Sequence, residues 1–239
     1  MLSDFKNEVL QIKGLISNSK HPLILVKENP SLDGLAAALV LYSCLKNGGK
    51  DASILCPSEL TVEFSDLIKI DEIKKEISGK GLVISWEYND GSIEKVSYNI
   101  ENNRFNLVIH PREGMELKIT PDKIDVKSTG LTSDLVVCIN TDNLAQLGKL
   151  FTLEQEMFSK IDIINVDNSI SNQNFGKINL VQPMVASVSE LMGMLLMDLG
   201  VRPDQEAATN LLTAIDLTSL NLTSGKLLPE TLEVAAWCL

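Results

Sequence analysis

The chain has few of the side chains that usually carry metal, redox or nucleic-acid chemistry. Its 239 residues include 2 histidines, 4 cysteines and 5% aromatic residues, and 21 basic side chains stand against 32 acidic ones. The net charge of −11 repels the phosphates that dominate nucleic-acid affinity, and no local basic patch offsets it, so general DNA or RNA binding is excluded. The cysteines lie far apart in apolar surroundings without a C-x-x-C pair, which favours buried free thiols over a zinc or redox site.

Long apolar runs are also missing. No uncharged apolar stretch approaches the roughly 18 residues that a membrane helix needs. The first eight residues are acidic and mixed, whereas a secretory signal is basic and then apolar. We therefore expect a soluble, cytoplasmic protein without membrane association. With 44% apolar residues and ordinary glycine and proline usage, the chain can form a packed globular core.

Short apolar runs alternate with helical patterns over most of the chain. The expected buried strands are 23–26, 52–55, 135–139 and 161–166. The expected helices are 5–16, 34–45, 62–77, 144–150, 185–199, 203–215 and 229–239. This alternation predicts an α/β fold, with a doubly wound, mainly parallel sheet flanked by helices in a single domain over 1–239.

Residues 82–128 follow a different pattern. Apolar residues there alternate with polar ones at period two, which is typical of half-buried antiparallel strands. Turn residues such as Asn102-Asn103 separate the runs. The segment therefore predicts an antiparallel β-meander inserted into the parallel sheet. Its aromatic residues favour cross-strand packing over a base-stacking platform, because no basic residues are interleaved with them.

Polar residues directly follow the predicted parallel strands. In open α/β sheets, ligands bind outside the carboxyl ends of the strands, so these residues are the candidate site. They are Lys27, Glu28, Asn29, Ser31 and Asp33 after the first strand, Asn140 and Asp142 after the strand at 135–139, and Asp167, Asn168 and Ser169 after the strand at 161–166.

The loops that carry these positions resemble motifs of the DHH phosphoesterases, in their oligoribonuclease and nucleotide-phosphatase branch. The first family motif, H-x-N-P-D-x-D before an Ala-rich helix, is similar to residues 27–33, with Lys27 in place of His and Ser31 in place of the first Asp, whereas Asp33 is kept. The second motif, an Asp followed eight residues later by Gly, resembles Asn140 and Gly148.

The third motif, D-H-H-x-S-N-x-x-F-G, resembles residues 167–176 and is the most specific match. Asp167 is kept, but Asn168 and Ser169 replace both name-giving histidines. A fourth motif, an Asp after a later helix, maps to Thr218, with Asp216 as a substitute if the register slips by two. The resemblance covers most of the chain, which stops before the family's small C-terminal substrate-binding domain.

The resemblance implies a site that has lost its metal ligands. The family holds two divalent cations, usually manganese, with Asp and His ligands, and a bridging hydroxide attacks a phosphoester. Only Asp33 and Asp167 remain as metal ligands here, and two carboxylates do not balance two cations. The leading hypothesis is a degenerate, non-catalytic member without a cofactor, with a structural, binding or regulatory role, whose protein partner could be a second copy or another chain.

Two other functions stay open from the sequence. One is a phosphoesterase acting on nucleotides or short oligonucleotides with one divalent cation, such as manganese, at a rearranged site. Its ligands would come from Asp33, Asp142, Asp167 and Asp216, with Lys27 holding phosphate. The other is a sensor that binds a small phosphorylated ligand through Ser31, Asn140, Asn168 and Ser169 without chemistry.

Each candidate residue also has an ordinary structural interpretation. Asp33 precedes a helical run and can cap that helix, which stabilises it by roughly 0.5–2 kcal/mol. Asn140 fits a turn, Asp167 a loop, and Lys27 a solvated strand end. Only their combined positions indicate a former site.

If Lys27 lies near Asp33 and Asp167, its ammonium group supplies the positive charge that the family obtains from metal. We then expect the fold to survive treatment with a chelator. The Lys27→Ala variant should lose stability unless a cation is added, which denaturant unfolding with and without manganese measures. Unchanged stability in this variant would contradict the hypothesis.

Overall fold

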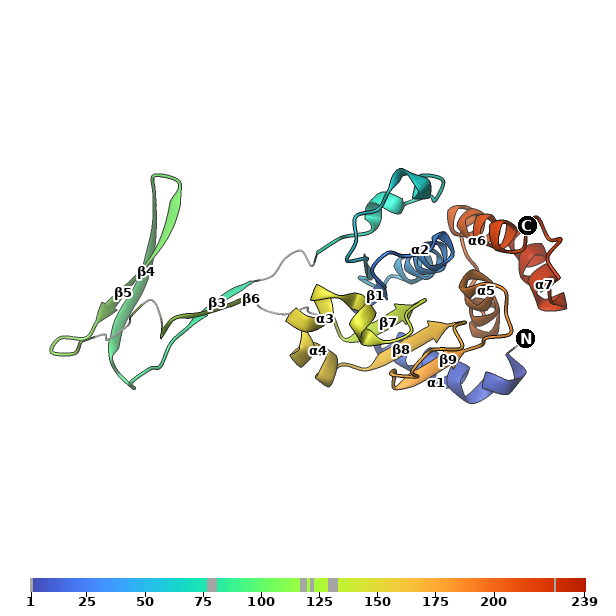
Figure 1. Ribbon diagram of the computed structural model, residues 1–239. Helices are drawn as coiled ribbons and strands as arrows, with labels where there is room; N and C mark the ends of the chain where they lie inside the picture. Colours follow the sequence, from blue (N-terminus) through green and yellow to red (C-terminus); the bar gives the residue numbers. More distant parts are fainter. Residues whose placement is uncertain (1, 77–80, 117–119, 121–122, 129–132, 226) are drawn as a thin grey trace. The chain divides into compact units, whose positions relative to one another are not determined.

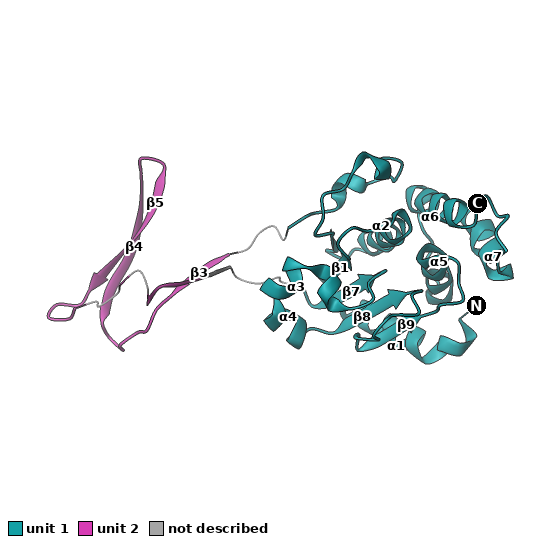
Figure 2. Ribbon diagram, viewed as in Figure 1, with its two compact units in different colours: residues 1–78, 131–239 teal, residues 79–130 magenta. Residues whose placement is uncertain are grey.

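The computed structural model describes residues 2–76, 81–116, 120, 123–128, 133–225 and 227–239. The chain divides into two compact units (Figure 2). Unit 1 comprises residues 1–78 and 131–239, and unit 2 comprises residues 79–130. Unit 1 carries the parallel sheet and the helices, whereas unit 2 consists of antiparallel strands.

Unit 1 is built on a five-stranded sheet in the order β2-β1-β7-β8-β9 (Figure 1). Every neighbouring pair is parallel. The strands are β1 (Pro22–Val26), β2 (Ser53–Leu55), β7 (Leu135–Ile139), β8 (Ile163–Asp167) and β9 (Ile178–Val181). The predicted doubly wound parallel sheet is confirmed. The short edge strand β9 was not predicted, because it follows a polar loop and only two of its four residues are buried.

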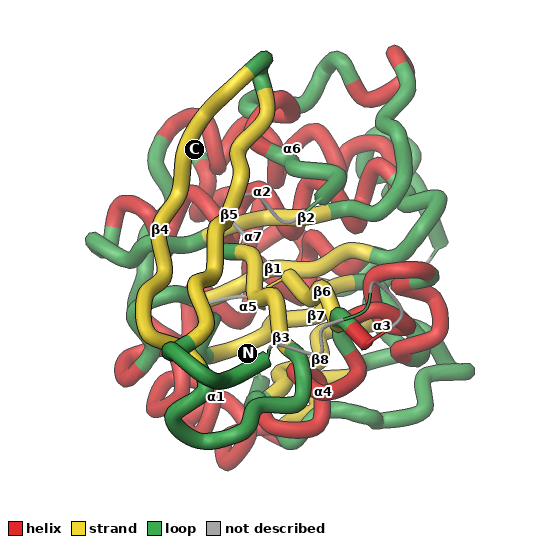
Figure 3. The backbone as a smooth tube through the Cα atoms, turned by 90° about the vertical axis from the view of Figure 1, so that its left-hand side faces the viewer, coloured by secondary structure: helices red, strands yellow, loops and turns green. Residues whose placement is uncertain are grey.

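Helices cover both faces of this sheet (Figure 3). They are α1 (Lys6–Asn18), α2 (Leu32–Asn47), α3 (Lys149–Leu153), α4 (Gln155–Lys160), α5 (Val188–Leu199), α6 (Gln205–Thr218) and α7 (Pro229–Cys238), with short 3-10 turns at η1 (Ser3–Phe5) and η5 (Leu144–Leu147). None of the described helices is long and apolar enough to cross a lipid bilayer.

The two faces form separate cores because successive strand residues point in opposite directions. Ile24 and Val26 of β1 pack in the larger core with α1, α2, α5 and α6. Leu23 and Leu25 pack in the smaller core with Phe158 of α4. Helix α2 is buried along most of its length, which explains why its sequence reads as almost continuously apolar.

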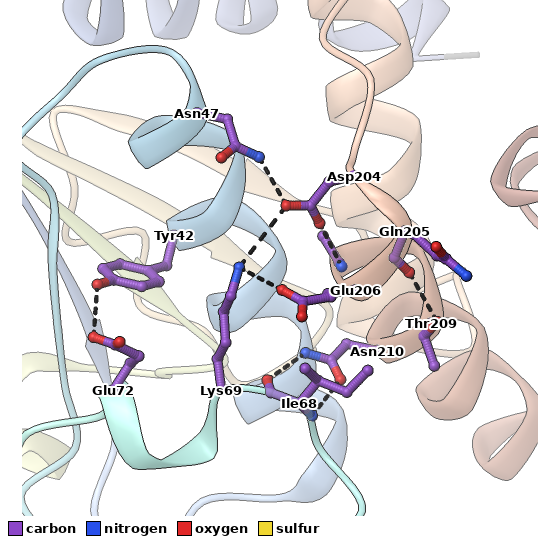
Figure 4. A network of polar contacts seen from close by, with 11 residues as sticks. Tyr42, Asn47, Ile68, Lys69, Glu72, Asp204, Gln205, Glu206, Thr209 and Asn210 are labelled. Atoms are coloured by element: carbon purple, nitrogen blue, oxygen red, sulfur yellow. Dashed lines mark hydrogen bonds and ion pairs between the residues drawn. The ribbon is translucent and has the colours of Figure 1, made fainter.

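The predicted helix at 62–77 is wrong for its described part, and residue 77 lies outside the described residues. Two single 3-10 turns, η2 (Val62–Phe64) and η3 (Ile70–Glu72), stand there instead. Figure 4 shows the cause: the Asn210 amide of α6 donates to the main-chain oxygen of Ile68 at 2.9 Å and accepts from its N–H at 2.8 Å. Lys69 then takes a left-handed conformation with φ of 64°, which a continuous helix does not allow.

Unit 2 contains two antiparallel ladders. Strands β4 (Ile93–Glu101) and β5 (Arg104–Pro111) form a hairpin, and β3 (Leu82–Ser85) pairs with β6 (Asp125–Ser128). The predicted turn at Asn102-Asn103 is confirmed, since both residues have φ near +55° as the two-residue hairpin turn requires. The strands are antiparallel as expected, but the order differs from a meander because β3 pairs with β6 and not with β4.

Gly193 provides a test of the packing between α5 and its neighbours. A Cβ atom there would collide with Val234 of α7 and lie 3.2 Å from Leu211 of α6. We expect Gly193→Ala to lower the free energy of unfolding by about 1–3 kcal/mol through overpacking. Gly14→Ala is the matched control: a Cβ atom in α1 meets nothing within 4 Å, so helix propensity should raise stability by about 0.5–1 kcal/mol. Urea unfolding of both variants measures whether the free energy of unfolding falls in Gly193→Ala and rises in Gly14→Ala.

Candidate functional site

The candidate site lies at the carboxyl edge of the sheet, where β1 and β7 are neighbours. From β1 the chain proceeds to β2 on one side, whereas β7 is followed by β8 and β9 on the other. The loops after β1 and β7 therefore diverge, which makes this pair the topological switch point where α/β sheets bind ligands. The loop after β8 joins them through the hydrogen bonds described below.

Asp33 links the N-termini of two helices. It lies in the first turn of α2, and its Oδ2 and Oδ1 accept hydrogen bonds from the main-chain N–H groups of Val188 at 2.7 Å and Ser189 at 2.9 Å, both in the first turn of α5. The Ser189 hydroxyl donates back to the main-chain oxygen of Asp33 at 3.0 Å. The cap of α2 itself is Ser31, whose Oγ accepts from the N–H of Gly34. The expectation that Asp33 caps its own helix is therefore wrong, because its carboxylate caps α5.

Asp33 and Asp167 come close enough to influence each other. Burial raises the pKa of Asp33, hydrogen bonds from Ser189 and Val188 oppose this rise, and the Asp167 carboxylate adds to it. The two aspartates kept from the family motifs thus face one region, although they come from different loops.

A chain of hydrogen bonds runs from the first loop to Asp167. The Ser31 hydroxyl donates to Oδ1 of Asn140 at 3.0 Å, and the Asn140 amide nitrogen lies 3.4 Å from Oδ1 of Asp167. Asn140 holds this position with a left-handed φ of 52°, which Asn tolerates better than most residues. Gly34 gives it room, since a Cβ atom there would lie 2.9 Å from Oδ1 of Asn140.

Asn172 organises the loop after β8. Its amide nitrogen donates to the main-chain oxygen of Thr141 at 3.0 Å and to Oδ2 of Asp167 at 2.7 Å. Its oxygen accepts from Asn165 at 2.7 Å and from the N–H of Asn174 at 2.8 Å. All of its amide donor and acceptor sites are therefore used to join the loops after β7 and β8.

Asp167 is fully buried, and protein donors surround it. Besides the Asn140 and Asn172 amides, the main-chain N–H of Asn168 donates to its Oδ1 at 2.9 Å. The Asn168 side chain turns to the main-chain oxygen of Val185 at 3.3 Å. The position of the first family histidine thus carries an amide that fastens the loop to the segment before α5.

Lys27 and Asp142 form the charged part of the site. Burial acts to raise the pKa of Asp142, but hydrogen bonds from Ser171 and Ser169 outweigh it, and the pKa is lowered. The positive charge of Lys27 contributes to this lowering. The sequence hypothesis placed Lys27 near Asp33 and Asp167. In the structure its positive charge acts on the carboxylate of Asp142.

The remaining predicted positions are less closely connected to this cluster. The Thr218 hydroxyl donates within its own helix to the main-chain oxygens of Ala214 and Ile215. Asp216 is exposed on α6. Gly148 has φ of 56°, and a Cβ atom there would collide with the carboxylate of Glu28, so the second motif's glycine accommodates an acidic side chain from the loop after β1.

The side chains of this site do not fit the two cations that the family resemblance implies. Two hard cations need several anionic or imidazole ligands, whereas the motif positions supply two carboxylates, Asp33 and Asp167, and each of their oxygens accepts at least one hydrogen bond from an N–H donor. Across the residues that the structure describes, no group of three or more His, Cys, Asp or Glu side chains is placed to hold a metal ion.

Ser171 and Asp142 form a serine–carboxylate pair at the edge of the site. Ser171 donates its hydroxyl proton to Oδ2 of Asp142 at 2.9 Å, which is the geometry of a nucleophile and base. The hydrogen bond joins the loops after β7 and β8.

Asn172, Ser171, Asn165 and Asn179 belong to the site and were not predicted. Asn172 stands inside the motif at 167–176, and its match to the family's Asn was the available signal. Asn165 is fully buried in β8, and the half-buried Asn179 of β9 accepts from Asn165 at 3.3 Å and from the N–H of Gly176 at 2.9 Å. A buried polar side chain inside an apolar strand is the signal that could have identified Asn165.

The fold is similar to that of solved phosphoesterase-like structures. An exopolyphosphatase-related protein from Bacteroides fragilis superposes with a TM-score of 0.68 at 12% identity, over 98% of this chain and 56% of that protein. A candidate family II inorganic pyrophosphatase from Methanococcus jannaschii gives a TM-score of 0.47 at 11% identity, over 91% of this chain and 55% of that protein. The chain spans about half the length of both. No family model and no protein with a curated description matches the chain. The first likeness shows that the chain shares the α/β fold of that exopolyphosphatase-related protein.

Asn172 provides a pH-dependent test of the site. In Asn172→Asp the two donated hydrogen bonds are lost and a second carboxylate faces the buried Asp167. We therefore expect the free energy of unfolding at pH 7 to be about 2–4 kcal/mol lower than in the unmodified chain. Burial raises the pKa of the introduced carboxyl above its unfolded value of about 3.9, so the deficit should shrink as the pH falls from 7 towards 4.

Asn174→Asp is the matched control, because it adds the same charge in the same loop at an exposed position. It should change stability by less than about 0.5 kcal/mol. Urea unfolding of both variants at pH 4 to 7 measures the difference. Equal deficits in the two variants would show that Asn172 does not hold the loops together.

Proposed function

We propose that this chain is a non-catalytic protein on a phosphoesterase-like fold, with a binding or regulatory role. The observation that supports the proposal is the donor set around Asp33 and Asp167. The four carboxylate oxygens of Asp33 and Asp167 together accept five hydrogen bonds from main-chain or amide N–H groups. In this interpretation the carboxylates bind loops and helices together, and N–H groups supply the positive polarity that cations supply in the family.

The charge at the rim disfavours a phosphate sensor as the second candidate. Lys27 is the basic residue beside the cluster. The carboxylate of Glu28 comes from the same loop after β1, and that of Asp142 comes from the loop after β7. A phosphate group placed there would meet at least as much negative as positive charge. We therefore place the binding function elsewhere on the molecule.

The test is titration of chelator-stripped protein with manganese chloride in a calorimeter. We expect no saturable binding that depends on Asp167, and no manganese-dependent hydrolysis of nucleotides or short oligonucleotides. Asp167→Asn is the informative variant, and Asp66→Asn, an exposed acid outside the site, is the control for unspecific charge effects.

Two outcomes would contradict the proposal. The first is manganese binding that Asp167→Asn abolishes and Asp66→Asn retains, which would indicate a rearranged metal site. The second is a rise in melting temperature with one nucleotide of a panel, since selective binding to the native state raises apparent stability and would restore the sensor hypothesis.

A further inference from the structure

The hairpin of β4 and β5 has one apolar and one polar face. The directly opposite pairs Val96–Ile109, Tyr98–Leu107 and Ile100–Phe105 point to one side. The pairs Asn99–Asn106 and Glu101–Arg104 point to the other side. We call the first set of six residues the apolar hairpin face.

The apolar hairpin face is solvent-exposed to an unusual degree. The exposed fractions are 55% for Val96, 68% for Tyr98, 69% for Ile100, 66% for Phe105 and 43% for Leu107. The rings of Tyr98 and Phe105, from neighbouring rungs of the face, stack with centroids 5.3 Å apart. Among the described residues, 12 of the 23 exposed large apolar side chains belong to unit 2, which has 52 of the 239 residues.

Such a hairpin is marginally stable on its own. An isolated two-stranded ribbon is at the limit of stability in water, whereas three or more strands with a buried apolar face are stable. Among the described side chains of unit 2, only that of Ser92 is buried, so the unit contains little core of its own. The apolar hairpin face therefore requires a covering surface.

The charges favour a second copy of this chain as the covering surface. Residues 79–130 carry 7 basic and 8 acidic side chains, which leaves 14 basic and 24 acidic side chains for the rest of the chain. The nearly neutral insert can approach its own copy with little repulsion, whereas the strongly acidic remainder repels other copies. An apolar face without a dominant charge is also self-complementary about a two-fold axis.

The area is sufficient for a weak dimer. Five of these side chains are 43–69% exposed and present roughly 500 Å² per chain, if an aromatic residue contributes about 150–250 Å² when fully buried. Two such faces bury roughly 1,000 Å² in total, which is about the lower limit for a specific interface. Packed face to face about 10 Å apart, the two hairpins form a four-stranded sandwich.

We propose that the apolar hairpin face pairs with the same face of a second copy, so that the insert is a homodimerisation element. The Asn99–Asn106 side is the outer, solvated side of this sandwich. In it, Asn106 donates to Asn99 across the strands at 2.8 Å.

Sedimentation velocity of the 239-residue chain from about 1 to 100 μM tests the proposal, because this is the range of affinity expected for an interface of this size. We expect the mass to rise with concentration from 26.2 kDa towards twice that value. The variant Tyr98→Thr/Leu107→Thr removes the central rung and should weaken dimerisation at least about tenfold. The control Asn99→Thr/Asn106→Thr changes the neighbouring rung on the polar face and should leave it within about twofold.

A measurement on the unmodified chain tests the proposal even if the variants fail to fold. Amide hydrogen exchange in β4 and β5 should slow as the protein concentration rises, because the hairpin is stable when paired. A chain that is monomeric over the whole range, or hairpin exchange that does not depend on concentration, would overturn the proposal and leave the face to a different partner. Equal weakening by the two double variants would overturn it as well.

Discussion

One carboxylate joins the two helices that start at the functional edge of the sheet. Asp33 lies in the first turn of α2, and its two oxygens accept the first free N–H groups of α5. Helix N-termini leave such donors unsatisfied and carry partial positive charge, so an anion between two of them is stabilised twice. This contact ties the N-terminus of α5 to that of α2, and α6 packs against both helices in the larger core.

The same principle extends to the rest of the site. Asp167 is buried in the sheet edge and is surrounded by N–H donors from the loops after β7 and β8, with Asn172 as the junction. In a metal centre on this kind of fold, cations would balance these carboxylates and hold the loops. Here amide and main-chain donors surround the buried carboxylate and join the loops after β7 and β8. A polar network of this kind specifies one arrangement of the loops, because each missing donor would leave a buried charge unsatisfied.

The insert differs from the rest of the chain in how its apolar side chains are buried. Unit 1 buries continuous apolar strands between helices, and its stability is internal. Unit 2 has two short ladders with large apolar side chains in solvent, and its stability depends on what covers them.

The sequence alone determined the elements whose signal is local. The apolar runs of β1, β7 and β8 and the helical pattern of α2 identify a parallel α/β sheet, because burial on both faces demands continuous apolar residues. It also identified the motif at 167–176 that contains the junction residue. Contacts between distant segments were decided only by the tertiary structure: the capping of α5 by Asp33, the role of Asn172, and the replacement of a predicted helix at 62–77 by turns that Asn210 holds from 142 positions away. A side chain's spacing along the chain gives its secondary structure, whereas its hydrogen-bond partner depends on which loops the sheet brings together.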